Sequence, residues 1–117
     1  LFVYWDMGEF YYLEHLAVAP HMRNRKIGQQ VLEHVETSLP GIRLLEVEPA
    51  EDELTARRVA FYRRNGYRIV DRSYVQPSYE NFGDAAPLWI MGNDTPERLP
   101  EFIERIKKDV YRDPLAR

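Results

Sequence analysis

The segment from His15 to Gly28 places the strongest constraint on how this chain can fold. Apolar residues run up to Pro20, basic residues follow in a short loop, and a helical pattern then begins. Proline ends a strand because it cannot donate to the ladder, and the first turn of a helix directs backbone N–H groups outward at the positive end of its dipole. This order predicts a site for a phosphorylated group, most simply a pyrophosphate, although a basic loop between a strand and a helix is also an ordinary structural connection.

The hydrophobic periodicity predicts an alternation of strands and helices along the whole chain. A turn at Asp6–Glu9 should join the first two strands as an antiparallel hairpin, and Thr95 should cap the last helix with Pro96 in its first position. A strand, a helix and a strand in succession predict a parallel crossover. The expected strands are 1–5, 10–18, 42–47, 67–75 and 88–91, and the expected helices are 29–39, 51–65 and 95–111.

Composition excludes several classes of function. The 117 residues suffice for one domain, and a net charge of −3 does not favour a nucleic-acid partner. No apolar run approaches the roughly 20 residues of a membrane helix, so we expect no membrane partner. The absence of cysteine excludes disulfides and thiol nucleophiles and fits a cytoplasmic protein. His15, His21 and His34 lack metal-site spacing, so no metal is expected.

The pattern Val18-x-Pro20-x-x-Arg23-x-x-Lys26-Ile27-Gly28 resembles the cofactor motif of the GNAT superfamily of acyl-CoA-dependent N-acetyltransferases. Arg23 and Gly28 match the motif, whereas Lys26 stands where a glycine is usual and must adopt an ordinary φ or carry strain. The resemblance covers about residues 1–92 and implies a GNAT-like α/β (α+β) fold. Its sheet would be mixed and mostly antiparallel, with a central βαβ crossover and flanking helices, in a single domain 1–117 whose helix 95–111 is an addition.

The same resemblance implies acetyl-CoA as the acyl donor and assigns its contacts. The strand should splay from its parallel neighbour and free backbone groups for the pantetheine arm, although a buried strand explains the same residues equally well. The loop and the first helical turn should cradle the pyrophosphate through backbone N–H groups. The expected arm-binding residues are Leu16, Ala17 and Val18, and the expected pyrophosphate-binding residues are Arg23, Asn24, Arg25, Lys26, Ile27, Gly28 and Gln29.

A second element, from Phe61 to Tyr67, resembles the family's Tyr-x-x-x-Gly-aromatic pattern. It implies that Tyr62 protonates the departing CoA thiolate, a role that suits a phenol with a pKa of about 10. A packed surface aromatic is the alternative. Thr55 and Arg58 depart from the residues usual in this helix, and Arg57 and Arg58 either reach a CoA phosphate or form an exposed basic face.

An attacking amine must lose a proton, because an ammonium has no lone pair. Glu14 is the first candidate for the base, since it lies two residues before Leu16 and on the same face of a strand. Glu46, Glu48 or a water chain are alternatives, and Glu14 is otherwise a solvated or ion-paired strand residue. Acidic and aromatic residues in 78–84 would suit a cationic amine at the acceptor pocket.

The leading hypothesis is an N-acetyltransferase that transfers an acetyl group from acetyl-CoA to a primary amine by direct attack in a ternary complex. The alternatives are a non-catalytic CoA-binding or interaction module with a degenerate GNAT fold, and a plain α/β structural domain. Family members usually have more chain before the cofactor motif, so we expect a front part to be missing here. The sheet edge at Leu1–Trp5 would then be uncovered and pair with that segment or in a homodimer.

Overall fold

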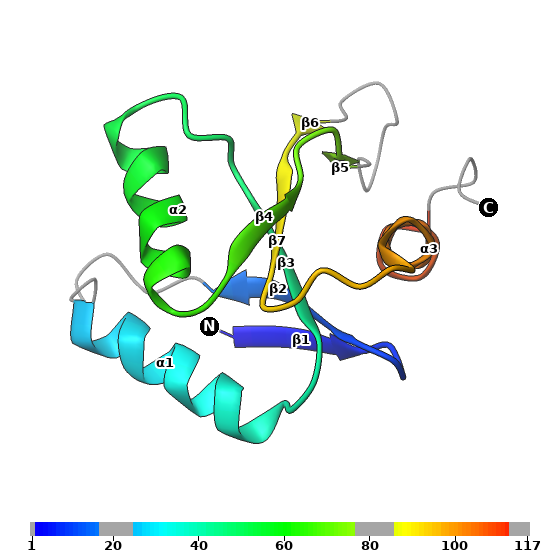
Figure 1. The fold of residues 1–117 in the computed structure, drawn as a ribbon, viewed down its shortest axis with the longest axis horizontal. Helices are drawn as coiled ribbons and strands as arrows, with labels where there is room; N and C mark the ends of the chain where they lie inside the picture. The colour runs from blue at the N-terminus through cyan, green and yellow to red at the C-terminus, as the bar shows by residue number, and fades with distance from the viewer. Residues whose placement is uncertain (1, 17–24, 77–85, 113–117) are drawn as a thin grey trace.

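A five-stranded sheet forms the centre of the molecule, with helices on both faces (Figure 1). The computed structural model describes residues 2–16, 25–76 and 86–112. The strand order is β1-β2-β3-β7-β4, and β5 and β6 form a second, two-stranded sheet. The strands are β1 (Phe2–Asp6), β2 (Tyr11–Leu16), β3 (Arg43–Val47), β4 (Arg68–Asp71), β5 (Val75–Gln76), β6 (Ala86–Pro87) and β7 (Trp89–Gly92). The helices are α1 (Arg25–Ser38), α2 (Glu53–Arg64), α3 (Leu99–Arg105) and a short π-helix, η3 (Ile106–Val110).

The sheet is mixed and mostly antiparallel, which confirms the predicted fold class. β2 pairs in parallel with β3, and α1 connects them in the predicted crossover. β1 pairs antiparallel with β2, and β7 pairs antiparallel with both β3 and β4. β1 forms one edge of the sheet and exposes about half of Tyr4 and 38% of Trp5. The pairing of this edge with another segment or chain stays a prediction.

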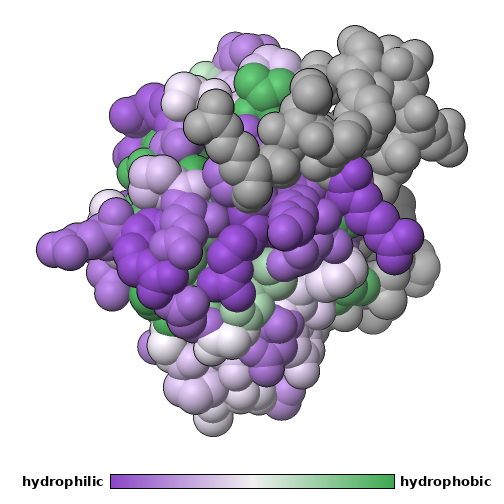
Figure 2. Space-filling view, turned by 90° about the vertical axis from the view of Figure 1, so that its right-hand side faces the viewer, coloured by the Kyte–Doolittle hydropathy of each residue, from purple (hydrophilic) through white to green (hydrophobic). Residues whose placement is uncertain are grey.

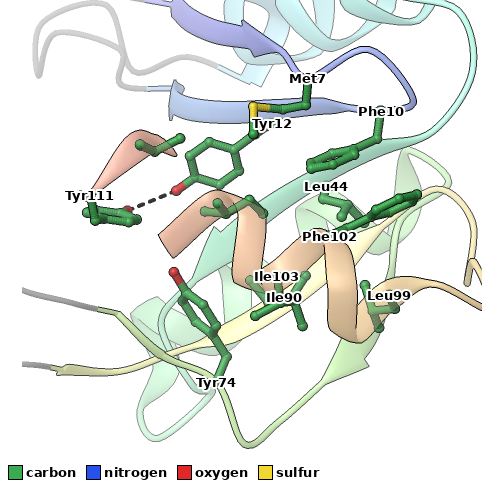
Figure 3. Packing of buried hydrophobic residues seen from close by; sticks show 12 residues of the cluster. Met7, Phe10, Tyr12, Leu44, Tyr74, Ile90, Leu99, Phe102, Ile103 and Tyr111 are labelled. Atoms are coloured by element: carbon green, nitrogen blue, oxygen red, sulfur yellow. Dashed lines mark hydrogen bonds between the residues drawn. The ribbon is translucent and has the colours of Figure 1, made fainter. Parts of the chain in front are cut away.

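Alternation along the strands divides the buried residues into two clusters, one on each face of the sheet. The α1–α2 cluster packs sheet residues against the first two helices, and the α3 cluster packs the opposite face against α3 and η3 (Figure 3). The α1–α2 cluster consists of Leu13, Leu32, Val35, Leu39, Leu45, Val47, Val59, Tyr67 and Met91. The α3 cluster consists of Met7, Phe10, Tyr12, Leu44, Tyr74, Ile90, Leu99, Phe102, Ile103, Ile106, Val110 and Tyr111.

The outer surface on the α3 side of the molecule is mostly hydrophilic (Figure 2). This agrees with an amphipathic α3 whose apolar residues face the sheet. Among the residues that the structure describes, no helix is long and apolar enough to cross a membrane.

The first helix begins at Arg25, four residues before the predicted start. Lys26 therefore lies inside α1 and has helical backbone geometry. Of the two possibilities for this residue, an ordinary φ or backbone strain, the structure has the ordinary φ. Gly66 after α2 has a φ of +89°, as expected for a glycine that ends a helix.

The predicted start of the last helix is wrong. Thr95 does not cap a helix, because its hydroxyl oxygen accepts a hydrogen bond from Arg68 Nε at 2.9 Å. Residues 96–99 form a turn closed by the Leu99 N–H and the Pro96 carbonyl, and α3 begins only at Leu99. The tertiary contact to β4 thus overrides the local capping signal.

The predicted continuous strand 67–75 is also interrupted. Asp71 Oδ1 accepts hydrogen bonds from both the backbone N–H and the hydroxyl of Ser73, at 2.7 and 2.9 Å. An aspartate that bonds two residues ahead forms a local turn that competes with the ladder. The chain therefore leaves the main sheet after β4 and forms β5 against β6.

We predict that Gly92→Ala destabilises the fold more than Gly66→Ala does. Gly92 is the buried last residue of β7, and a Cβ there would lie 2.7 Å from Leu44 Cδ2 and 3.0 Å from the Asp94 carbonyl oxygen. We expect a loss of about 3 kcal/mol in the free energy of unfolding, typical of overpacking. Gly66 has open space around it, so its substitution carries only the left-handed penalty of about 1 kcal/mol. Urea denaturation measures both; equal losses would contradict the steric account.

Candidate active site

The first turn of α1 is fixed against the last turn of α2. A Cβ on Gly28 would lie 3.2 Å from Phe61 Cζ, so the glycine allows the two helices to approach closely. Next to it, Gln29 Nε2 donates to Asn65 Oδ1 at 2.6 Å, and Asn65 Nδ2 donates to the Phe61 carbonyl at 2.8 Å. The positions of the two helix ends relative to one another therefore depend on a glycine and a hydrogen-bonded amide pair.

β2 and β3 stop pairing before either strand ends. Within the described residues, their ladder contains Tyr11↔Arg43, Tyr12↔Leu44 and Leu13↔Leu45, whereas β2 continues to Leu16 and β3 to Val47. The register with β1 shifts at the same point, passing from Tyr4↔Leu13 to Val3↔His15, which is a bulge at Glu14. A bulge bends its strand and increases the local twist. In Figure 1, β1 and β2 run across the view and β3, β7 and β4 run up it.

The predicted cofactor residues fall on these two features where the structure describes them. Leu16 is the last residue of β2, beyond the end of the β2–β3 ladder. Arg25, Lys26, Ile27 and Gly28 are the first four residues of α1, and Gln29 follows. Ala17, Val18, Arg23 and Asn24 lie outside the described residues, as does the acceptor loop 78–84 with Glu80 and Asp84.

Tyr62 lies on α2, partly buried against the α1–α2 cluster. Its ring makes edge contacts with Phe61 and Tyr67, at centroid distances of 5.6 and 6.2 Å. Burial, and to a lesser degree Tyr67, raises the pKa of Tyr62 to about 12, while Arg58 opposes the shift. The phenol is therefore protonated throughout the neutral range and can act as a donor.

Glu14 is hydrogen-bonded at the sheet edge. Its Oε2 accepts from Trp5 Nε1 at 2.6 Å, across the β1–β2 hairpin. Its role as a base stays a prediction.

Glu46 on β3 is the centre of a partly buried cluster of polar side chains on the α3 face. Its Oε1 accepts a hydrogen bond from the Tyr111 hydroxyl at 2.5 Å and another from Gln76 Nε2 at 3.0 Å. Gln76 Nε2 also donates to the Tyr111 oxygen at 2.9 Å, and the hydroxyls of Tyr12 and Tyr111 lie 3.0 Å apart. The other carboxylate oxygen, Oε2, is buried and has no hydrogen-bond partner in the described part of the chain.

Glu46 lies just past the last β2–β3 pair and opposite Ile90 of β7. Tyr62 belongs to the opposite face of the sheet. The candidate acid and this candidate base are thus on two sides of the sheet, and Glu46 adjoins the point where β2 and β3 part. Glu48, the third candidate, is exposed and pairs with Arg58 at 3.3 Å.

The sequence patterns gave no indication of a role for Tyr111, Gln76 or Tyr12. Tyr111 follows Ile106 by five residues, which is outside the helical period that identified Phe102, Ile103, Ile106 and Val110. Gln76 follows the predicted strand 67–75, in a stretch where the sequence predicts no regular structure. Val110 and Tyr111 are adjacent in the sequence and both are buried, which a regular helical period does not predict.

Two departures from the family pattern have structural explanations. Thr55 completes a capping box with Asp52, whose carboxylate accepts from the Thr55 N–H at 2.8 Å. That backbone bond, together with the Thr55 hydroxyl, lowers the pKa of Asp52. Arg57 pairs with Glu53, and Arg58 with Glu48, as expected for an exposed basic helix face.

Within residues 2–16, 25–76 and 86–112, no group of three or more histidine or acidic side chains is arranged to hold a metal ion.

Comparison with known proteins agrees with this geometry. A family model described as the acetyltransferase (GNAT) domain matches residues 1–69. A solved structure of a protein from Bacteroides thetaiotaomicron, assigned to the GNAT family of acetyltransferases, aligns over 94% of this chain with a TM-score of 0.86 and 34% identity. The chain spans 64% of the length of that protein. No curated protein gave a significant match. The chain belongs to the GNAT family of acetyltransferases.

We predict that Gly28→Val weakens acetyl-CoA binding at least tenfold, as measured by calorimetric titration. The branched side chain would push Phe61 away and displace the first turn of α1 from the end of α2. Gln30→Val, on the exposed side of the same helix, is the matched control and should leave the dissociation constant unchanged. Equal effects of the two substitutions would mean that helix propensity, and not the contact with Phe61, determines binding.

Proposed function

We propose that this chain carries the donor-binding and catalytic part of an N-acetyltransferase, which transfers the acetyl group of acetyl-CoA to a primary amine by direct attack in a ternary complex. The observation that carries the proposal is the early end of the β2–β3 ladder, followed along the chain by the first turn of α1. Family membership supports the class of reaction and the donor. The acceptor class rests on the chemistry of the site.

The described residues fit the donor. β2 beyond Leu13 offers backbone groups to which an extended, amide-containing arm can pair like an added strand. The first four N–H groups of α1 have no carbonyl one turn earlier in the helix, and they lie at the positive end of the dipole. The sequence of that turn contains two basic residues, Arg25 and Lys26. This combination favours a pyrophosphate.

Tyr62 would stabilise the departing thiolate by hydrogen bonding. With a pKa of about 12, complete proton transfer to a thiolate, whose conjugate thiol has a pKa of about 8.5, is uphill by about 3.5 units, or about 5 kcal/mol. Donation to the charge that develops on sulfur does not require that transfer.

Glu46 would accept the proton of the attacking amine. In the transfer step the amine lone pair forms the C–N bond, the C–S bond breaks, and the nitrogen loses a proton. Glu46 Oε2 is the carboxylate oxygen that has no hydrogen-bond partner among the described residues, and it lies next to the parting strands. A carboxylate is also suited to attract a cationic acceptor before that acceptor loses its first proton.

We predict that Tyr62→Phe lowers kcat about 100-fold with little change in the dissociation constant of acetyl-CoA, because the phenol acts only on developing charge. Steady-state kinetics with thiol detection and calorimetry measure the two quantities. Tyr11→Phe removes a hydroxyl from a residue packed against the same cluster and serves as the control. Parallel losses in kcat and binding would indicate a packing role for Tyr62.

We predict that Glu46→Gln lowers kcat about 100-fold or more, whereas Glu14→Gln and Glu48→Gln lower it less than threefold. The reason is that Glu48 is exposed and ion-paired, and Glu14 accepts from Trp5, whereas Glu46 keeps one carboxylate oxygen without a partner among the described residues. Kinetics over a panel of amines at saturating acetyl-CoA provides the measurement. Full activity of Glu46→Gln would exclude Glu46 as the base; binding of acetyl-CoA without turnover of any amine would support a non-catalytic module.

A further inference from the structure

We infer that the C-terminal helix is a part of the active site, because Tyr111 is a positioning residue that anchors one oxygen of the Glu46 carboxylate and leaves the other without a hydrogen-bond partner among the described residues. This inference rests on the proposed role of Glu46 as the base. Tyr111 lies outside residues 1–69, which the family model matches. The anchor therefore comes from a segment that the shared motif does not include.

The hydroxyl of Tyr111 connects three polar side chains. It donates to Glu46 Oε1 at 2.5 Å, and its oxygen receives the Gln76 amide at 2.9 Å. The Tyr12 hydroxyl, 3.0 Å away, then donates to the second lone pair of the same oxygen (Figure 3). Gln76 also donates to Glu46 Oε1, so this oxygen receives two hydrogen bonds. The rotation of the carboxylate is thereby fixed, and Oε2 remains as the oxygen that can take a proton.

The π-helix brings Tyr111 to this position. In a regular α-helix, residue 111 would be rotated by about 140° from residue 106 and would miss the sheet. Here the Tyr111 N–H bonds to the Ile106 carbonyl at 3.4 Å, five residues back, so the chain gains one residue in the turn. Ile106, Val110 and Tyr111 can then all be buried on one face. Arg112, with a φ of +54°, ends the helix immediately afterwards.

The protonation of the hydroxyl pair supports anchoring. Burial and the nearby Glu46 charge raise the pKa of both Tyr12 and Tyr111, so both phenols remain donors at any working pH. The side chain of Tyr12 is fully buried. A proton passed along the hydroxyls would end in the core, so the pair holds the carboxylate and does not conduct protons to solvent.

In the part of the chain that the structure describes, Tyr12 and Tyr111 are the titratable groups close to Glu46. They come from β2 and from the end of η3. β5 contributes the neutral Gln76, and β7 contributes the apolar Ile90 opposite Glu46. Lys107 of η3 pairs with Glu104 at 3.6 Å and lies over the ring of Tyr74.

The test is a pH titration of the Glu46 carboxyl carbon by NMR, in the whole chain labelled with ¹³C-glutamate. Glu46→Gln identifies the signal. Tyr111→Phe keeps the buried ring and removes a hydrogen-bond donor that favours the charged form of Glu46. In this variant, the midpoint of the Glu46 titration should therefore move up by about one pH unit. Arg105→Gln is the control: it removes an ion pair with Glu9 and a bond to the Met7 carbonyl, which also hold α3, but touches nothing on Glu46. We expect no shift from it.

An unchanged midpoint of the Glu46 titration in Tyr111→Phe would overturn the anchoring role. Equal shifts in Tyr111→Phe and Arg105→Gln would also overturn it, because loosening of the helix would then be the cause.

Kinetics separates this inference from the proposed function. If both hold, Tyr111→Phe lowers kcat about tenfold, leaves the KM for acetyl-CoA unchanged and moves the acidic limb of kcat to higher pH. If Glu46→Gln is fully active, the proposed base fails, although the anchor can still be judged from the titration. If Glu46→Gln is inactive and Tyr111→Phe is fully active, only the positioning role fails.

Discussion

The parallel pairing of β2 with β3 ends after Leu13 and Leu45, and the arrangement of the site depends on this early end. A parallel ladder that continued to Leu16 and Val47 would use the backbone groups of both strands within the sheet. The bulge at Glu14 bends β2 directly after the last pair of this ladder. The chain then returns through α1, whose first turn is held by Phe61 and Asn65 of the α2 end. Strand end and helix start thus become neighbouring parts of one site.

The two clusters place a protonated phenol on one face of the sheet and a carboxylate on the other. Tyr62 packs in the α1–α2 cluster, where burial keeps it protonated. Glu46 faces the α3 cluster, where an isolated carboxylate would be costly to bury. The hydroxyl of Tyr111 and the amide of Gln76 compensate one oxygen, and the second remains without a partner among the described residues. In the proposed mechanism, the donor to sulfur and the acceptor of the nitrogen-bound proton would therefore come from opposite faces of the sheet.

The features predicted from sequence are those that local rules determine. The crossover follows from a strand, a helix and a strand, and Gly66 ends α2 because its positive φ suits a residue without Cβ. Local patterns failed where a distant contact or an irregular helix decides the structure. Arg68 donates a hydrogen bond to the Thr95 hydroxyl, which therefore does not cap a helix. Tyr111 is buried because a π-helix precedes it. The choice among Glu14, Glu46 and Glu48 was likewise beyond the sequence. Alternation in the sequence places Glu46 and Glu48 on one face, but β3 ends at Val47. Glu48 is exposed and pairs with Arg58, whereas Glu46 is held by Tyr111, a residue 65 positions away.

The most direct test of this account is the change in backbone amide shifts when acetyl-CoA is added to the ¹⁵N-labelled chain. The account predicts that the largest changes fall at the end of β2, at Leu16, and in the first turn of α1, from Arg25 to Gly28. Amides on the outer side of α3, such as Glu101, should not move. Binding that leaves both of these segments unchanged and perturbs another surface would contradict the assignment of the donor site.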